Sequence, residues 1–353
     1  MHRLAVVALF ISSAVLPAAA KKKSPAKTDH FRKTEIEAAT RLQIFLDRAN
    51  FSPGRIDGRY NDVTWKALGL YRQSRGEQPQ AASRRRNVAP EVNGLDLASV
   101  EPVFVSYTVT EADLQSVGKL PGQVAQQSKL KFLPYRDAAD AIAEKFHSDI
   151  QFVEQLNPGK LKAIKVGDQV MVPNVEPFEL ALVKDIQPGS ETSRQAANEI
   201  EYQSETETSK PNENAAGPRS VSVKIDTKTN MLGVFETEKL MAAYPVTVGS
   251  QHTASPIGDW KVMHITKMPT FRYDKEMLQH GERSGNFYML PPGPRNPVGV
   301  MWIALNKKGI GIHGTNEPGS IGRAVSHGCI RLTNWDVARL ATKIKRGDSI
   351  SIH

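Results

Sequence analysis

The sequence predicts a multidomain protein with a mainly-β C-terminal domain that carries one helix, preceded by a small α-helical module and a βααβ module. Two early segments space their apolar residues with helical periodicity, whereas the last third of the 353 residues consists of short alternating stretches. Two polar segments without periodicity separate these parts. The expected organisation is a leader at 1–20, a helical module at 35–74, a linker at 75–102, the βααβ module at 103–177, a disordered linker at 187–219 and the β domain at 220–353.

The N-terminal residues have the pattern of an export signal. Arg3 precedes an apolar run at 4–16, and the small residues at 17–20 (Pro-Ala-Ala-Ala) offer a cleavage site. The run is shorter than the roughly 20 residues of a membrane span, although the lysines at 21–23 favour an uncleaved anchor as the alternative. We expect cleavage after residue 20 and a soluble protein that is exported to the periplasm or cell wall.

The charge balance favours anionic surroundings. The sequence has 46 Lys and Arg against 37 Asp and Glu, a formal net charge of +9, which suits contact with nucleic acid, phospholipid or a bacterial wall polymer. No nucleic-acid-binding motif occurs, and outside 21–23 and 84–86 the basic residues are scattered, so a solvated basic surface is the simpler interpretation. We expect no nucleic-acid partner and no cofactor.

The helical module is expected to contain a helix, two turns and a second helix. Apolar residues at 36–49 follow helical spacing. Pro53-Gly54 and Asp57-Gly58 signal turns before a second helix that is expected from about Asp62. This pattern resembles the small helical peptidoglycan-binding domain through Leu42-Gln43, Phe51, Pro53-Gly54, Ile56-Asp57-Gly58, Tyr60, Thr64, Ala67-Leu68 and Tyr71. A structural cap that binds no ligand is the alternative.

The βααβ module is expected to have strands at 107–109 and 169–172 and helices at 137–146 and 152–156. It resembles the LysM module, a sugar-binding unit, through Ile142-Ala143-Glu144-Lys145-Phe146, Leu156-Asn157-Pro158, Gly167-Asp168-Gln169 and Val172-Pro173. The resemblance implies binding to glycans that contain N-acetylglucosamine, and thus retention on the wall. An insertion at 116–134 departs from the family pattern and bears on the glycan groove.

Composition defines the two linkers. The stretch 75–97 is rich in Gln, Ala, Arg and Pro and has no periodicity. The stretch 187–219 is rich in Ser, Thr, Glu, Asn and Pro and has almost no apolar residues. Such a segment cannot bury enough surface to offset its chain entropy. We therefore expect it to be disordered and to separate the modules from the β domain.

A series of short alternating stretches predicts the β domain. Strands are expected at 221–226, 232–236, 243–248, 260–265, 301–305, 310–313 and 349–352, and one helix from Asn334 or Asp336 to about Lys345. Many short strands with one helix favour a β-sandwich or barrel. The polar, aromatic and proline-rich stretch 268–297 is expected to form a long loop over the functional site, with ordinary loop packing as the alternative role of its aromatic side chains.

Cys329 is the only cysteine of the chain, so it has no partner for an internal disulfide, and we expect it to be a nucleophile. A thiol with a pKa of about 8.5 needs a proton acceptor or a positive field to react at neutral pH. His313 and His327 are candidate acceptors. Arg331 is a fixed cation that can favour the thiolate or hold a substrate carboxylate.

Glycines beside these residues leave the backbone unobstructed. The N–H groups near Gly328 and Cys329 are candidate donors to the oxyanion of a tetrahedral intermediate, for which one donor contributes roughly 3 kcal/mol in other acyl-transfer enzymes. The expected chemistry is acyl transfer through a thioester. A zinc site made of His313, His327 and Cys329 is the chemical alternative, but no fourth ligand is evident nearby, and we expect no metal.

The segment around Cys329 resembles the signature of the L,D-transpeptidase catalytic domain of the YkuD type. The matching residues are His313-Gly314-Thr315-Asn316, Ser320-Ile321-Gly322 and Ser326-His327-Gly328-Cys329-Ile330-Arg331-Leu332, supported by Tyr244-Pro245-Val246, Gly249, Ser255-Pro256-Ile257-Gly258, Asn296-Pro297-Val298-Gly299 and Trp302-Ile303.

That resemblance implies a role for each site residue. Cys329 attacks a peptide carbonyl, and His313 accepts and returns the proton, with its imidazole oriented by a backbone carbonyl such as that of Gly314. Substrate contacts and oxyanion donors are expected at Gly314, Ser326, Gly328 and Arg331, and His327 lines the site. Because residues 327 and 329 share a face of an extended chain, His327 stays open as the base.

The resemblance also implies a reaction on peptidoglycan. The thiol attacks the third residue of a tetrapeptide stem, releases the terminal D-alanine and passes the acyl group to an amine. A second stem as acceptor gives a 3→3 cross-link, a lysine side chain gives an anchored wall protein, and water gives a carboxypeptidase product; the loop at 268–297 is expected to select among them. A non-catalytic peptidoglycan-binding scaffold is the alternative outside enzymes, and the intact cysteine and both histidines argue against it.

Overall fold

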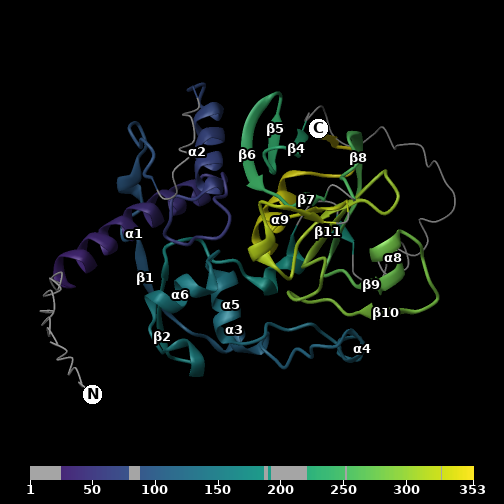
Figure 1. Ribbon diagram of the computed structural model, residues 1–353, viewed down its shortest axis with the longest axis horizontal. Helices are drawn as coiled ribbons and strands as arrows, with labels where there is room; N and C mark the ends of the chain where they lie inside the picture. The colour runs from purple at the N-terminus through teal and green to yellow at the C-terminus, as the bar shows by residue number, and fades with distance from the viewer. Residues whose placement is uncertain (1–24, 79–87, 187–189, 192–220, 251–252, 327) are drawn as a thin grey trace, which may run out of the picture.

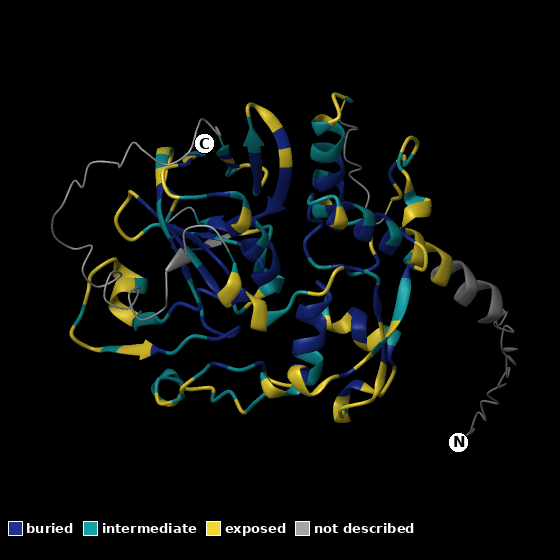
Figure 2. Ribbon diagram, turned by 180° about the vertical axis from the view of Figure 1, so that it is seen from behind, coloured by how far each residue is buried: buried dark blue, intermediate teal, exposed yellow. Residues whose placement is uncertain are grey.

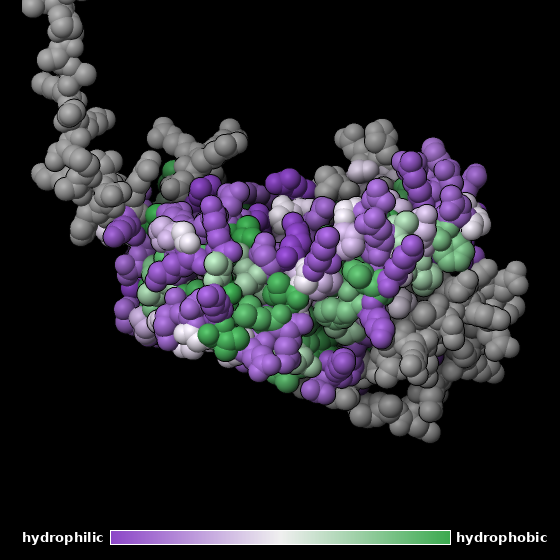
Figure 3. Space-filling model, turned by 90° about the horizontal axis from the view of Figure 1, so that it is seen from below, coloured by the Kyte–Doolittle hydropathy of each residue, from purple (hydrophilic) through white to green (hydrophobic). Residues whose placement is uncertain are grey.

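The computed structural model describes residues 25–78, 88–186, 190–191, 221–250, 253–326 and 328–353, and the expected leader at 1–20 lies outside them. The helical module and the βααβ module pack together on one side of the β domain (Figure 1). Within the described residues, no helix is both long and apolar enough to cross a bilayer. Seen from below, patches of hydrophobic side chains interrupt a mainly hydrophilic surface (Figure 3).

The helical module consists of α1 (Pro25–Arg48) and α2 (Asp62–Ser74). α1 begins before residue 35, where the module was expected to start, whereas α2 begins at the expected residue. Asn61 caps α2, because its side-chain oxygen accepts a hydrogen bond of 2.9 Å from the backbone N–H of Thr64. The two helices and the turns between them therefore form one compact unit around Leu42, Leu46 and Leu68.

The chain after α2 corrects the expected linker at 75–102. Residues 88–102 contain the short helix η1 (Leu97–Ser99), and Val100 at its end is fully buried. Arg41 of α1 donates a hydrogen bond of 2.9 Å to the Val100 carbonyl, which fixes the segment against the helical module. The apolar residues of this segment are irregularly spaced and give no periodic signal, yet they pack against the core of the helical module. Residues 79–87 lie outside the described part of the chain.

The βααβ module has the order strand, helix, helix, strand. Its elements are β1 (Phe104–Thr108), α5 (Ala138–Lys145), α6 (Ile150–Leu156) and β2 (Gln169–Pro173), with the additional short helices α3 (Glu111–Gln115), α4 (Val124–Gln127) and η2 (Leu161–Ala163). β1 and β2 pair antiparallel, with Phe104 opposite Pro173. The insertion at 116–134 runs beneath the β domain (Figure 1), where the N–H of Leu133 donates to the Pro292 carbonyl at 2.9 Å.

The β domain is built on one nine-stranded sheet in the order β14-β12-β11-β8-β15-β4-β5-β6, with β3 beside β8. Its strands are β3 (Ser190–Glu191), β4 (Val221–Asp226), β5 (Met231–Glu236), β6 (Lys239–Pro245), β8 (Gly258–Lys267), β11 (Met301–Leu305), β12 (Gly311–His313), β14 (Ile330–Arg331) and β15 (Ser349–Ile352). β7 (Val248–Gly249) and β13 (Ala324–Ser326) pair separately, and η4 (Pro318–Ser320) precedes β13.

The sheet curls around a single apolar core. β8 pairs with β15 through its first half and with β11 through its second half, so the two halves of the sheet turn toward each other. Helix α9 (Asn334–Lys343) adds Val337, Leu340 and Ala341 to this core, which is the buried region of strands and helix in Figure 2. The mainly-β expectation is confirmed, and a curled sheet replaces the expected sandwich.

The expected loop at 268–297 is instead a structured hairpin. β9 (Phe271–Asp274) pairs antiparallel with β10 (Phe287–Leu290), and α8 (Lys275–His280) lies between them, so the expectation of one helix in this domain is wrong. Asp274 holds the hairpin: its carboxylate accepts from the N–H of Met277, which caps α8, and from the N–H and hydroxyl of Ser284. The many polar and proline residues of this stretch are typical of a loop, so the sequence did not indicate this local hydrogen-bond network.

The modules dock directly on the β domain, which corrects the expectation that a disordered linker separates them. Asp47 of α1 pairs with Arg339 of α9 through contacts of 2.9 and 3.0 Å. The same carboxylate lies 3.1 Å from Nδ1 of His147, which follows α5. In addition, the N–H of Ser52 donates to the Ala243 carbonyl of β6 at 2.8 Å, so the helical module extends the edge of the sheet.

The chain between the modules and the β domain also contributes structure. Residues 180–185 form η3 (Leu180–Asp185), and Val183 enters the core of the β domain. β3 pairs in parallel with β8, opposite Ile265 and Thr266. The expectation of disorder over 187–219 is therefore wrong for residues 190–191, and the rest of that stretch lies outside the described residues.

Candidate active site

Three adjacent strands position the candidate site. β12 and β14 pair in parallel, with Ile312 opposite Ile330 and His313 opposite Arg331. Both isoleucines are fully buried in the core of the domain. Because side chains alternate along a strand, His313 and Arg331 lie on the opposite face of the sheet, and Cys329 directly precedes β14. Burial of Ile312 and Ile330 on the core side therefore places the polar side chains of β12 and β14 on the other face of the sheet.

The His313 imidazole is buried and held by two neighbours. Its Nδ1 lies 2.6 Å from the Gly314 carbonyl, which can only accept, so Nδ1 carries the proton and Nε2 is the acceptor. Trp302 of β11 pairs opposite His313, and the two rings stack at a centroid distance of 5.2 Å. Burial, aided by the nearby Arg331 cation, lowers the pKa of His313 to about 3. The imidazole is therefore neutral at physiological pH.

Cys329 is half-buried, and its thiol is free. Its Sγ lies 3.5 Å from the Gly309 carbonyl, at the turn that leads into β12. Burial raises the pKa of the thiol, while the Gly311 backbone and the Arg331 cation act in the opposite direction. The thiol and the imidazole are therefore both neutral at neutral pH and do not form a thiolate–imidazolium pair.

A tight turn presents the thiol. The Ser326 hydroxyl donates to the Cys329 carbonyl at 2.6 Å and accepts from the N–H of Gly328 at 3.2 Å. Gly328 has a φ of +108°, a conformation that L side chains rarely adopt. Ser326 thus holds the turn, and in this state it occupies the Gly328 N–H that was expected to serve as an oxyanion donor.

Sequence reasoning gave no role at the site to two residues that contribute to it. Trp302 stacks on His313 because Gly311 has no side chain, and a Cβ there would lie 2.6 Å from the indole ring. Thr253 donates from its hydroxyl to the Ser326 carbonyl at 2.7 Å and so braces the turn. The register of β11 against β12 would have revealed the tryptophan, but a short strand gives no register from sequence alone.

The structure brings most of the expected site residues together. Those that meet on or beside β12 and β14 are His313, Gly314, Ser326, Gly328, Cys329 and Arg331. His327 lies outside the described residues, so its part in the chemistry stays a prediction. Across the residues with described positions, no group of three or more His, Cys, Asp or Glu side chains is arranged to hold a metal ion.

A curled β sheet that carries a tethered imidazole on β12 and a cysteine thiol just before β14 has the groups that acyl transfer through a cysteine requires. The family model described as the L,D-transpeptidase catalytic domain, YkuD, matches residues 220–352. The YqjB protein of Bacillus subtilis is 32% identical over 140 residues, which are 38% of this chain and 72% of YqjB. This chain therefore belongs to the YkuD family of L,D-transpeptidases.

Other known proteins resemble the same part of the chain. YkuD of Bacillus licheniformis is 33% identical over 135 residues, and the match spans 38% of this chain and 66% of that protein, slightly less than two thirds of its length. Among solved structures, an L,D-transpeptidase from Mycobacterium smegmatis is 20% identical with a TM-score of 0.32, over 38% of this chain and 59% of that chain. A TM-score this low supports no conclusion about function.

Proposed function

We propose that this protein is a peptidoglycan L,D-transpeptidase in which Cys329 forms a thioester with a tetrapeptide stem. One observation carries the proposal. His313 of β12 pairs opposite Arg331 of β14, the strand that Cys329 directly precedes, and its Nδ1–H is tied to the Gly314 carbonyl. That arrangement leaves Nε2 as the proton acceptor for the thiol, which is the pairing that cysteine acyl transfer requires.

The proton moves during attack, because both groups are neutral at rest. As Sγ bonds to the carbonyl carbon of the third stem residue, the S–H bond breaks and Nε2 of His313 takes the proton. Collapse of the tetrahedral intermediate breaks the C–N bond to the terminal D-alanine, and the imidazolium gives its proton to the leaving amine. The acceptor amine then attacks the thioester, loses a proton to His313, and the regenerated thiol recovers it.

Arg331 is the candidate substrate contact. Its guanidinium lies beside Cys329 and is largely buried, and its Nε has no hydrogen-bond partner among the described residues. A buried guanidinium donor without a partner favours a bidentate contact with a carboxylate. We assign Arg331 to the carboxylate of the donor stem, with a second effect of stabilising negative charge on sulfur.

The two N-terminal modules fit retention on the wall. We propose that the βααβ module is a LysM-like glycan-binding unit and that the helical module is a peptidoglycan-binding unit, as their sequence patterns indicate. Peptidoglycan is then the partner of all three parts, and the site of action is the periplasm or cell wall after removal of the leader. The net charge of +9 suits an anionic wall polymer.

Mass spectrometry of products tests the function. Purified protein is mixed with disaccharide-tetrapeptide, and the masses distinguish a cross-linked dimer, an exchanged stem and a hydrolysed tripeptide. We expect loss of D-alanine with transfer to an amine; addition of a lysine-containing wall protein tests the anchoring reaction. Unchanged substrate after incubation with folded protein would refute the proposal, and a tripeptide alone would assign a carboxypeptidase.

A further inference from the structure

We propose that Glu144 of the βααβ module is a positioning residue for the active-site histidine, acting through Asn334 and the backbone of Gly314. The inference rests on the proposed roles of Cys329 and His313. It makes the N-terminal module a part of the catalytic unit rather than only a wall anchor.

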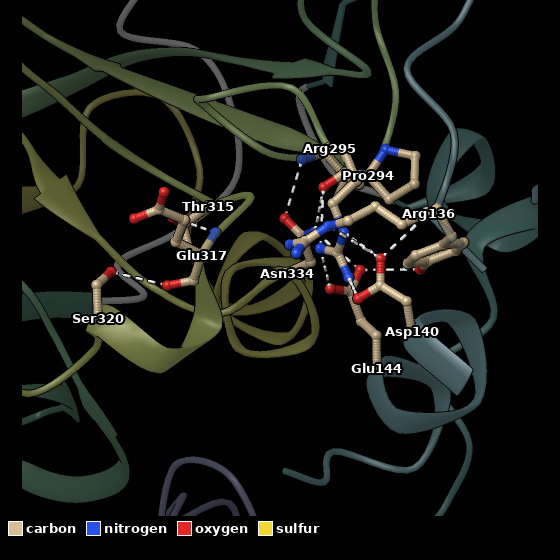
Figure 4. A network of polar contacts seen from close by, with 11 residues as sticks. Arg136, Asp140, Glu144, Pro294, Arg295, Thr315, Glu317, Ser320 and Asn334 are labelled. Atoms are coloured by element: carbon tan, nitrogen blue, oxygen red, sulfur yellow. Dashed lines mark hydrogen bonds and ion pairs between the residues drawn. The ribbon is translucent and has the colours of Figure 1, made fainter. Parts of the chain in front are cut away.

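Glu144 is buried at the interface between the module and the β domain, where its carboxylate is part of a polar network (Figure 4). Oε1 accepts from the Tyr135 hydroxyl at 2.8 Å and from Nδ2 of Asn334 at 2.9 Å. Oε2 accepts from the Arg295 guanidinium at 2.9 Å. Both oxygens are therefore satisfied, and two of the three donors belong to the β domain.

The Glu144 carboxylate sets how the Asn334 amide is turned, together with the Pro294 carbonyl, which accepts from the same Nδ2 group at 3.2 Å. A carboxylate only accepts hydrogen bonds, so Asn334 must present its Nδ2 group to Glu144. Its Oδ1 is then directed to the opposite side, where it accepts from the N–H of Val300 at 3.2 Å. The reversed amide would place two donors opposite each other at Val300 and leave Glu144 facing an oxygen.

Asn334 in turn packs against the two glycines that shape the backbone beside His313. A Cβ at Gly299 would lie 2.2 Å from Oδ1 of Asn334, and a Cβ at Gly314 would lie 2.3 Å from the same atom. The amide oxygen thus fills the space that both glycines leave open. The Gly314 carbonyl accepts the 2.6 Å hydrogen bond from Nδ1 of His313, so the chain of contacts ends on the imidazole.

Asp140 supplies a matched control. It lies one turn before Glu144 on α5 and binds the same Arg295 guanidinium through contacts of 2.6 and 2.8 Å. It makes no hydrogen bond to Asn334. Neutralising either carboxylate weakens the docking of the module in a similar way, but only the change at Glu144 disturbs the amide that lies against Gly314.

The test compares Glu144→Gln with Asp140→Asn in the full-length protein. A carbapenem acylates the thiol, and stopped-flow absorbance gives the acylation rate constant at saturation and the apparent dissociation constant separately. Because a displacement of the imidazole of about 1 Å lowers a rate substantially, we expect Glu144→Gln to lower the saturating rate constant roughly 10- to 100-fold with little change in binding. Asp140→Asn is expected to stay within roughly threefold, although both variants lose thermal stability.

A reciprocal exchange provides the rescue. In Glu144→Gln combined with Asn334→Asp, the Gln side chain can offer its oxygen to Arg295 and its amide to the new carboxylate, which still accepts from Val300 N–H. The exchange gives up only the hydrogen bond from Nδ2 of Asn334 to the Pro294 carbonyl. We expect the double variant to recover most of the rate lost in Glu144→Gln, whereas Asn334→Asp alone sets two carboxylates in contact and is slow. Where Glu144→Gln does not fold, Glu144→Asp replaces it, since it keeps the charge beside Arg295 but shortens the reach to Asn334.

Four outcomes contradict the inference. Equal rate constants in Glu144→Gln and wild type, or equal losses in Glu144→Gln and Asp140→Asn, overturn the positioning role while leaving the proposed function intact. A double variant as slow as Glu144→Gln overturns the route through Asn334. Failure of wild-type protein to form any adduct at Cys329 overturns the proposed function, and the inference falls with it.

Discussion

At the scale of single residues, burial sets the chemistry of the site. Burial moves the pKa of His313 down and that of Cys329 up, so both partners stay neutral in the resting state. The Gly314 carbonyl then decides which ring nitrogen is free. In the proposed mechanism the proton therefore leaves the thiol as it attacks, and no thiolate forms in advance.

Replacement of the nucleophile should separate chemistry from folding. We expect Cys329→Ala to lower release of D-alanine from a tetrapeptide stem by roughly 10³-fold or more, because the sequence has no second cysteine that could act as the nucleophile. Because Cys329 is only half-buried and the change removes a single sulfur atom, the urea midpoint should barely change. Retained turnover in this variant would remove Cys329 from the mechanism.

Alkylation reports the ionisation of the thiol. A thiol whose pKa is raised stays protonated at neutral pH, and its reactivity grows as pH rises toward that pKa. We expect the rate of iodoacetamide labelling to increase across the alkaline range, with a midpoint above the ordinary value of about 8.5. Intact mass reports the adduct unambiguously, since the chain has one cysteine. A rate already at its plateau at neutral pH would contradict the neutral resting pair.

At the scale of elements, strand pairing brings together groups that are distant in sequence. β12 lies between β11 and β14, so Trp302, His313 and Arg331 come from three strands yet share one face. Gly311 is what allows the indole of Trp302 to lie flat beside the imidazole, because any side chain there would enter the ring. The stacking is thus a property of the pairing and of one missing side chain.

A methyl group at Gly311 should disturb this pairing. Its Cβ would lie 2.6 Å from the Trp302 ring and 2.9 Å from the Ile303 carbonyl, so the indole must move away from His313. We expect Gly311→Ala to lower the free energy of unfolding by about 1–3 kcal/mol and to reduce turnover. Gly285→Ala is the matched control, because nothing lies within 4 Å of a Cβ there. Equal urea midpoints for the two variants would contradict the steric argument.

At the scale of the whole molecule, buried ion pairs join the modules to the β domain. Arg295 is 3% exposed and pairs with both Asp140 and Glu144, while Arg339 pairs with the fully buried Asp47. Burial acts to raise the pKa of Asp47, yet the Arg339 and His147 partners hold it well below its usual range. The three parts therefore behave as one body in the described structure.

Removal of the Arg295 cation should weaken the docking of the βααβ module on the β domain. Two carboxylates would remain buried without their partner, so we expect Arg295→Met to lower the free energy of unfolding by about 3–5 kcal/mol. Arg136→Met is the control, because its contact with Asp140 is 3.7 Å long and its side chain is 59% exposed; we expect a change within about 0.5 kcal/mol. Calorimetry measures both, and an Arg295 variant as stable as wild type would show that docking does not depend on this pair.

Several features of the fold and of the candidate site could be predicted from the sequence alone. The lone cysteine, the two histidine-glycine pairs and their spacing predicted Cys329 and His313 as site residues, which stays a prediction, and the alternating stretches predicted the mainly-β domain, which is confirmed. These features are local: a strand pattern and a short signature need no distant partner to be recognised. The helix start at Asp62 was equally accessible, because Asn61 caps it within one turn.

Only the tertiary structure decided how the parts meet. The hairpin at 271–290, the packed segment at 88–102 and the docking through Asp47, Arg295 and Glu144 had no periodic signal. The same holds for Asn334, whose role follows from a carboxylate 190 residues away in the chain. Charged residues at such positions look like any solvated surface until folding buries them, because their partners come from remote segments and burial alone determines which pairs form.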